Sequence, residues 1–238
     1  MNLPLLILLF AALPVAAAAW VRRSGSDADF VKLLLAFSGA FLLSITVVHM
    51  LPELYEHGGH GIGPWVLAGF MLQVVLEFFS RGIEHGHVHV HGGHTHTLPL
   101  ATLLSLCMHS FTEGLPFADP AVRDNWPFVA GVLMHKAPMA IALATVLHRS
   151  QVPAGRSWAM LLIFAAALPL GIVAGLLGGD HFGGDFLSRA LALAIGMLLH
   201  ISTTIIFEST PDHRFNAKRF ITVLAGAALA FLSMHGAH

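Results

Sequence analysis

The fold of this chain is decided by two polar clusters set within apolar segments between residues 107 and 148. The first cluster reads MHSFTEGLP (108–116), and the second reads MHKAPM (134–139). Histidine, carboxylate and lysine side chains are costly to place in hydrocarbon, so their presence inside a membrane segment indicates a functional site. We expect the other segments to form a frame that holds these two together.

The composition indicates an integral membrane protein. Of 238 residues, 56% are hydrophobic and 11% are charged, whereas a soluble domain has about 25% charged residues. The net charge of −1 gives no reason to expect a nucleic acid as partner. The single cysteine, Cys107, excludes an intramolecular disulfide and a cysteine-based zinc site. The 17 histidines are unusual, and histidine is the commonest metal ligand.

Eight apolar segments predict an all-α polytopic membrane protein, with one transmembrane domain over residues 1–238. A membrane helix needs about 20 mostly apolar residues. The segments lie at 2–21, 29–52, 62–82, 98–118, 127–148, 157–179, 185–208 and 217–236. We expect the first to be a retained span in the lipid bilayer rather than a cleaved signal peptide. It lacks a basic n-region, and Arg22 and Arg23 follow it directly.

The basic residues predict the orientation of these spans. Nine lie in the loops after the first, third, fifth and seventh spans: Arg22, Arg23, Lys32, Arg81, Arg149, Arg156, Arg214, Lys218 and Arg219. The opposite loops hold only Arg123 and Arg189. Because basic loops stay in the cytoplasm, we expect a multi-pass protein of the plasma (inner) membrane with both termini on the non-cytoplasmic side.

The loop at residues 83–97 differs in composition from the other connections. By the charge argument it is cytoplasmic, and it contains six histidines: His85, His87, His89, His91, His94 and His96. Such a tract binds many soft or borderline metal ions without choosing among them. We expect an accessory role in metal collection, and a polar linker without metal is the alternative.

The two polar clusters are predicted to form one site. His109 and Glu113 are four residues apart and therefore share a helix face. In antiparallel spans, Glu113 and His135 lie about 15 and about 13 residues from the cytoplasmic helix ends, so their depths agree within about 3 Å. His109 and Met139 match one turn deeper. Two imidazoles and a carboxylate suit zinc or another divalent first-row ion. Interhelical hydrogen bonding without a metal is the alternative.

Further polar residues inside the spans are candidates for an ion pathway. These are His49, Glu53, Glu77, His200 and Glu208. Gln73 shares a helix face with Glu77, for which pairing with Lys136 is an alternative role. The second and seventh spans also have a common pattern, a Ser/Thr-rich stretch and a histidine before a terminal glutamate, in segments 41–53 and 197–208. Because the two spans are predicted to run in opposite directions, this pattern suggests inverted repeats, with chance similarity as the alternative.

These motifs resemble those of the ZIP (Zrt/Irt-like) family of divalent metal transporters. HSFTEG (109–114) is similar to the family's fourth-helix motif His-Asn/Ser-x-x-Asp/Glu-Gly, and HKAP (135–138) to its fifth-helix motif His-Glu/Lys-x-Pro. HMLPE (49–53) resembles His-Leu-Leu-Pro-Glu at the end of the second helix. The resemblance implies metal uptake toward the cytoplasm and a 3+2+3 helix arrangement with inverted repeats. It also implies a homodimer and an elevator-like movement of helices four and five past a fixed block.

Two departures from the family pattern modify the expected site. Lys136 stands where many members have an acidic ligand of a second metal. Since an ammonium group cannot ligate and repels cations, we expect one transported metal. Met139 replaces a glutamate, so a thioether is offered in place of a carboxylate. The expected metal residues are His109, Ser110, Glu113, His135 and Met139.

The transported ion expected at this site is Zn²⁺, and Fe²⁺, Mn²⁺, Cd²⁺ and cobalt remain open. Two other classes of protein are alternatives. A membrane-embedded zinc hydrolase would use Ser110, Glu113 and His135 around an activated water. A haem electron carrier would use paired histidines such as His109 and His200.

Overall fold

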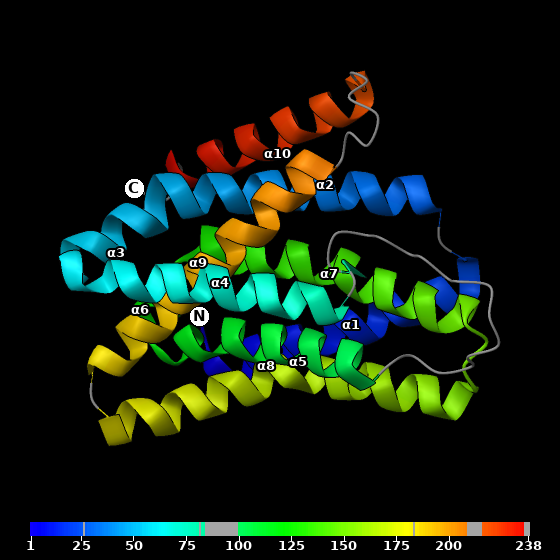
Figure 1. Cartoon of the computed structure of the whole chain (residues 1–238), viewed down its shortest axis with the longest axis horizontal. Helices are drawn as coiled ribbons and strands as arrows, with labels where there is room; N and C mark the ends of the chain where they lie inside the picture. Colours follow the sequence, from blue (N-terminus) through cyan, green and yellow to red (C-terminus); the bar gives the residue numbers. More distant parts are fainter. Residues whose placement is uncertain (26, 81, 84–99, 183, 209–215, 236–238) are drawn as a thin grey trace.

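The structure, a computed structural model, describes residues 1–25, 27–80, 82–83, 100–182, 184–208 and 216–235 (Figure 1). Every regular element in these residues is helical. In chain order, the first elements are α1 (Leu3–Ser24), α2 (Ala28–Ile45), the π-helix η1 (Thr46–Met50), α3 (Leu51–Gly58), the 3-10 helix η2 (His60–Ile62) and α4 (Gly63–Ser80). They are followed by α5 (Leu100–Gly114), the 3-10 helix η4 (Leu115–Ala118), α6 (Pro120–Asp124), α7 (Trp126–Arg149), α8 (Ala154–Phe182), α9 (Gly184–Glu208) and α10 (Ala217–His235).

The all-α polytopic membrane fold predicted from the sequence is confirmed. Within the described ranges, seven helices are long and apolar enough to cross a membrane, judged by length and composition. The predicted span at 98–118 is not one of them, because α5 has only 15 residues before the chain tightens into η4. Pro116 lacks the N–H that would continue the α-helical pattern, which explains this early end. The eighth crossing stays a prediction.

The second span is longer and less regular than the sequence indicates. It runs as one helical segment over Asp29–Gly58, past the predicted end at residue 52. Asp27 caps its start by accepting a hydrogen bond from the Asp29 backbone N–H at 3.0 Å. The π-helix η1 interrupts the α-helix at Thr46–Met50. Single π turns inside helices are rare and are found frequently at functional sites.

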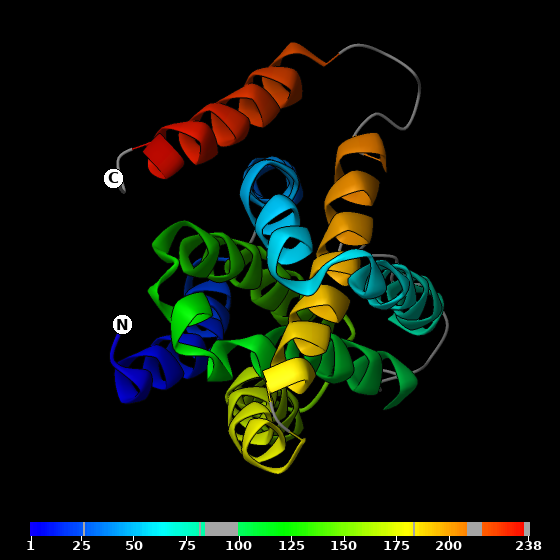
Figure 2. The ribbon, with the colours of Figure 1, turned by 90° about the vertical axis from the view of Figure 1, so that its left-hand side faces the viewer.

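The helices pack as two groups. In the first, α5 packs against α8, and α1 against α7 and α8; in the second, α4 packs against α9, and α2 against α9 and α10. The groups meet where α2 contacts α7 and α4 contacts α5. Figure 1 shows α9 crossing the other long helices obliquely, and Figure 2 shows α10 at the periphery beyond α2. The site described below lies where α4, α5 and α7 approach one another.

Small residues allow the closest helix approaches in both groups. A Cβ added to Gly171 on α8 would lie 2.1 Å from the Phe111 carbonyl oxygen on α5. A Cβ added to Gly69 on α4 would lie 2.0 Å from the Leu193 carbonyl oxygen on α9. Membrane helices associate largely through such close packing, because lipid supplies no hydrophobic driving force between them. These crossings therefore fix α5 on α8 and α4 on α9.

Candidate metal centre

Helix α5 carries two members of the site on one face. His109 and Glu113 are one turn apart, and His109 Nε2 lies 3.2 Å from Glu113 Oε1. The side chains are 0% and 1% exposed. Because α5 ends at Gly114 and η4 begins at Leu115, Glu113 lies in the last turn of its helix. The two residues thus form a buried imidazole–carboxylate pair.

Helix α7 brings the third member. Asn125 caps this helix by accepting a hydrogen bond from the Phe128 backbone N–H at 3.1 Å, and Pro127 follows in the first turn, where a missing N–H is tolerated. His135 lies about two and a half turns further on and is wholly buried. Its ring centre is 6.0 Å from that of His109.

The ligand atoms of His109, Glu113 and His135 lie within 4.8 Å of one another. A tetrahedral zinc ion with ligands at about 2.0–2.1 Å would hold them roughly 3.3 Å apart. The set therefore needs to contract by only about 1.5 Å to hold an ion. Counting residues from the helix ends predicted that His135 lies close to the His109–Glu113 pair, and the measured distances agree.

The His109–Glu113 pair is buried with few polar contacts. Apart from the 3.2 Å contact between His109 Nε2 and Glu113 Oε1, no hydrogen bond to the Glu113 carboxylate oxygens is found among the described residues. Buried polar groups are almost always hydrogen-bonded, and burying a carboxylate without compensation costs several kcal/mol. A cation held between these atoms would supply the missing interactions, so the cluster has the chemistry of a metal site.

Lys136 lies beside the cluster without joining it as a ligand. Its Nζ donates a hydrogen bond to Ser110 Oγ and lies 4.3 Å from the ring centre of Phe164 on α8. The side chain is 0% exposed, and its charge interacts with that of Glu113. Ser110, a predicted metal residue, is therefore already engaged through one of its oxygen lone pairs.

The other predicted residues have different surroundings. Met139 is wholly buried in an apolar cluster that includes Leu106 and Leu143, and its role as a ligand stays a prediction. Glu77 Oε2 on α4 lies 3.4 Å from His200 Nδ1 on α9, a pairing that the sequence did not indicate.

The remaining pathway and loop residues are not part of the three-residue cluster, and several of them lie outside the residues that the structure describes. His49 and Glu53 are about half exposed, with Nε2 and Oε2 3.8 Å apart near the end of the second span. Glu208 ends α9, but its side chain lies outside the described part of the chain. The six loop histidines, at 85–96, also lie outside the described residues.

Two features near the site were not assigned from the sequence. One is the π-helix η1, whose Thr46 is buried with no hydrogen bond to its hydroxyl among the described residues. The other is the contact between Gln73 Oε1 on α4 and His109 Nδ1, at 3.0 Å. A glutamine one turn before Glu77 in a largely apolar span was the available signal, but its partner depends on how α4 packs against α5.

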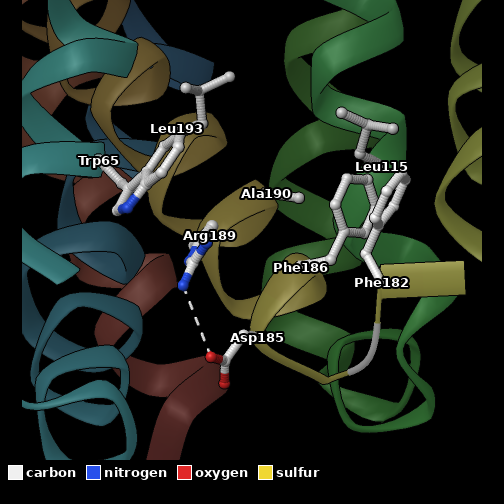
Figure 3. A pocket seen from close by; sticks show the side chains of 8 residues that line it. All are labelled: Trp65, Leu115, Phe182, Asp185, Phe186, Arg189, Ala190 and Leu193. Atoms are coloured by element: carbon white, nitrogen blue, oxygen red, sulfur yellow. Dashed lines mark ion pairs between the residues drawn. The ribbon is translucent and has the colours of Figure 1, made fainter. Parts of the chain in front are cut away.

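A separate pocket is lined by none of the three clustered residues. Its volume is about 480 Å³, and it is lined by Trp65, Leu115, Phe182, Asp185, Phe186, Arg189, Ala190 and Leu193. Figure 3 shows aromatic rings on two sides and the ion pair between Asp185 and Arg189, whose charged atoms are 3.5 Å apart. With one carboxylate already paired and no histidine, this lining does not resemble a metal site.

Fold and site together define a multi-pass helical membrane protein with a buried His–Glu–His cluster shared by two helices. Residues 84–234 match the family described as ZIP Zinc transporter. This match covers more than half of the chain, and the chain therefore belongs to that family. The family consists of transporters, which agrees with the expectation that this chain is not an enzyme.

Curated relatives lie in the same family. The chain is 25% identical over 147 residues to zinc transporter ZIP9-B of Xenopus laevis, a match covering 60% of this chain and 48% of that protein. It is 24% identical over 147 residues to zinc transporter ZIP9 of Micropogonias undulatus, covering 60% and 47%. The chain thus spans about half the length of the curated relatives it matches.

Proposed function

We propose that this protein moves divalent transition-metal ions, zinc foremost, across the plasma (inner) membrane through the centre formed by His109, Glu113 and His135. The observation that carries the proposal is that one ligand atom from each of these three buried residues lies within 4.8 Å of the other two, within reach of one ion. Family membership supports transport as the activity, and the relatives named as zinc transporters support zinc as the cargo.

The proposed direction, uptake toward the cytoplasm, is the one that the resemblance to the ZIP family implies. Nine basic residues in one set of loops against two in the other support a cytoplasmic position for the first set. In this orientation both termini lie on the non-cytoplasmic side. His49 and Glu53, half exposed near the outer end of the second span, would meet the ion first. The Glu77–His200 pair offers a carboxylate and an imidazole beyond the centre.

An elevator-like movement agrees with the division of the helices into two groups. Both helices that carry the centre, α5 and α7, belong with α1 and α8, whereas α2, α4, α9 and α10 form the other group. Movement of the first group past the second would carry the metal without dismantling its ligands. Helices α5, α7 and α8 also hold Lys136, whose charge would move with the centre and disfavour a second cation. We further propose that the protein acts as a homodimer, as the resemblance implies.

The proposal is tested by uptake into liposomes. Purified protein is reconstituted with a zinc-sensing dye inside, and zinc is added outside. Wild type should show influx that His109→Ala and Glu113→Ala reduce to the rate of empty liposomes. His148→Ala, which removes an exposed histidine from the end of α7, is the matched control and should transport normally. Absence of influx in wild type, or normal influx in His109→Ala, would refute the proposal.

The zinc hydrolase considered from the sequence has no independent support. Ser110, one of its three candidate residues, accepts a hydrogen bond from the Lys136 ammonium group. Membership in a transporter family also argues against this alternative.

A further inference from the structure

Gln73 is a polar residue buried in the middle of an apolar helix. Its side chain is 0% exposed, and it lies on α4, outside the group of helices that carries the metal centre. Its Oε1 lies 3.0 Å from His109 Nδ1, while no partner is described for its Nε2 within the described residues. An amide in this environment is costly, so the contact it makes with a candidate ligand needs an explanation.

The contact determines which nitrogen of His109 carries the proton. If Gln73 Oε1 accepts the hydrogen bond, Nδ1 is protonated and Nε2 keeps a free lone pair. Nε2 is the nitrogen that lies 3.2 Å from Glu113 Oε1, on the side of the centre. If the amide were turned around, its N–H would donate to Nδ1, and Nε2 would carry the proton. Only the first arrangement leaves His109 able to bind a metal through Nε2.

Helix α4 is held firmly enough to act as a support for this contact. One turn before Gln73, a Cβ at Gly69 would lie 2.0 Å from the Leu193 carbonyl oxygen, so the backbones of α4 and α9 are in direct contact. On the α5 side, Ser105 Oγ donates a hydrogen bond of 2.5 Å to the Leu76 carbonyl oxygen. In this conformation, Gln73 therefore approaches His109 from a helix that has close contacts with both α9 and α5.

We propose that Gln73 is a positioning residue of the metal centre: its amide oxygen holds His109 in the tautomer and ring orientation that direct Nε2 to the metal. This inference rests on the proposed function and adds to it a residue from the opposite helix group. Partners that orient a metal-binding histidine through its second nitrogen commonly contribute 10–100-fold to metal affinity. The amide supplies this support without adding a charge to a centre that already holds Glu113 and Lys136.

Substitutions at Gln73 separate this role from simple packing. Gln73→Met keeps the length and volume of the side chain but has no oxygen acceptor, whereas Gln73→Glu restores an acceptor. Zinc affinity of the detergent-solubilised protein is measured by calorimetry, and the absorption spectrum of bound Co²⁺ reports its coordination. We expect Gln73→Met to bind zinc about 10–100-fold more weakly with an altered cobalt spectrum. Gln73→Glu should recover most of the affinity. Gln151→Met, at the exposed glutamine after α7, is the control and should behave as wild type.

A second measurement needs no substitution at Gln73. Histidine ¹⁵N shifts of the metal-free wild type, assigned by comparison with His109→Ala, should show Nδ1 of His109 protonated and Nε2 bare. Protonated Nε2, or unchanged zinc affinity and cobalt spectrum in Gln73→Met, would overturn the inference. If wild type binds no zinc at all, the proposed function fails. The ¹⁵N shifts of the metal-free protein then still show whether Gln73 fixes the tautomer of His109.

Discussion

Lys136 Nζ on α7 donates a hydrogen bond to Ser110 Oγ on α5, and each of these residues directly follows a histidine of the metal centre. The same ammonium group lies over the ring of Phe164 on α8, so three helices enclose it. The positive charge of Lys136 therefore lies close enough to interact with Glu113. Such a charge offsets the buried carboxylate and repels any second cation at close range.

Replacing Lys136 with glutamate should increase the number of metal ions bound. Lys136→Glu removes the ammonium group and adds a carboxylate beside Glu113, which supplies a ligand for a second ion. The zinc content measured by elemental analysis, in zinc-saturated protein that lacks the histidine-rich residues 85–96, should rise from one ion per chain toward two. Lys136→Met, which removes the charge but adds no ligand, is the control and should remain at one. A stoichiometry of one in Lys136→Glu would contradict this account of the second site.

Zinc should stabilise the folded protein through the three clustered residues. A ligand that binds only the folded state at about 100 times its Kd adds about 2.7 kcal/mol to the free energy of unfolding. We therefore expect zinc to raise the melting temperature of wild type in detergent and a chelator to reverse the rise. His135→Ala should abolish the shift because it removes one of three ligands, whereas His148→Ala should keep it. A full shift in His135→Ala would exclude that residue from the site.

The crossing of α4 and α9 should tolerate no added atom. A Cβ at Gly196 would lie 1.9 Å from the Val66 carbonyl oxygen, so Gly196→Ala forces the backbones apart. Overpacking of this kind costs about 1–3 kcal/mol, and thermal unfolding in detergent should show a lower melting temperature. Gly155→Ala is the control, because nothing lies within 4 Å of a Cβ added there. Equal melting temperatures for the two variants would show that the crossing is looser than described.

The histidine-rich loop should contribute to metal collection but not to passage through the membrane. Deleting residues 85–96 removes six histidines and none of the residues clustered at the centre. The variant should bind fewer weakly held zinc ions at equilibrium and still transport zinc in liposomes. Complete loss of uptake, with normal yield and melting temperature, would mean that the loop is part of the transport path.

Much of the site could be predicted because helix geometry is regular. His109 and Glu113 share a face because residues four apart lie one turn apart on a helix. Counting 1.5 Å per residue from the helix ends placed His135 at about the depth of Glu113. The same counting placed Met139 level with His109; its side chain packs in an apolar cluster, and its role as a ligand stays a prediction. Hydrophobic length predicted the fourth span at 98–118; its described part is helical from Leu100 to Ala118, as α5 followed by η4, and its crossing of the membrane stays a prediction.

Contacts between helices distant in the sequence could not be predicted in this way. Glu77 pairs with His200 across the α4–α9 crossing, and Gln73 meets His109 across the α4–α5 contact. Spacing along one helix says nothing about the rotation of that helix against its neighbours. That rotation is set by where small residues such as Gly69 and Gly171 let two backbones touch.

The sequence by itself determined the membrane class, the helical segments and three of the ligand candidates, because hydrophobic length and i,i+4 spacing are local properties. Only the tertiary structure decided which further buried polar groups meet: Lys136 with Ser110, and Gln73 with His109. These pairings depend on close backbone packing among helices far apart in the chain. A buried polar group is stabilised only by the partner that this packing brings within reach.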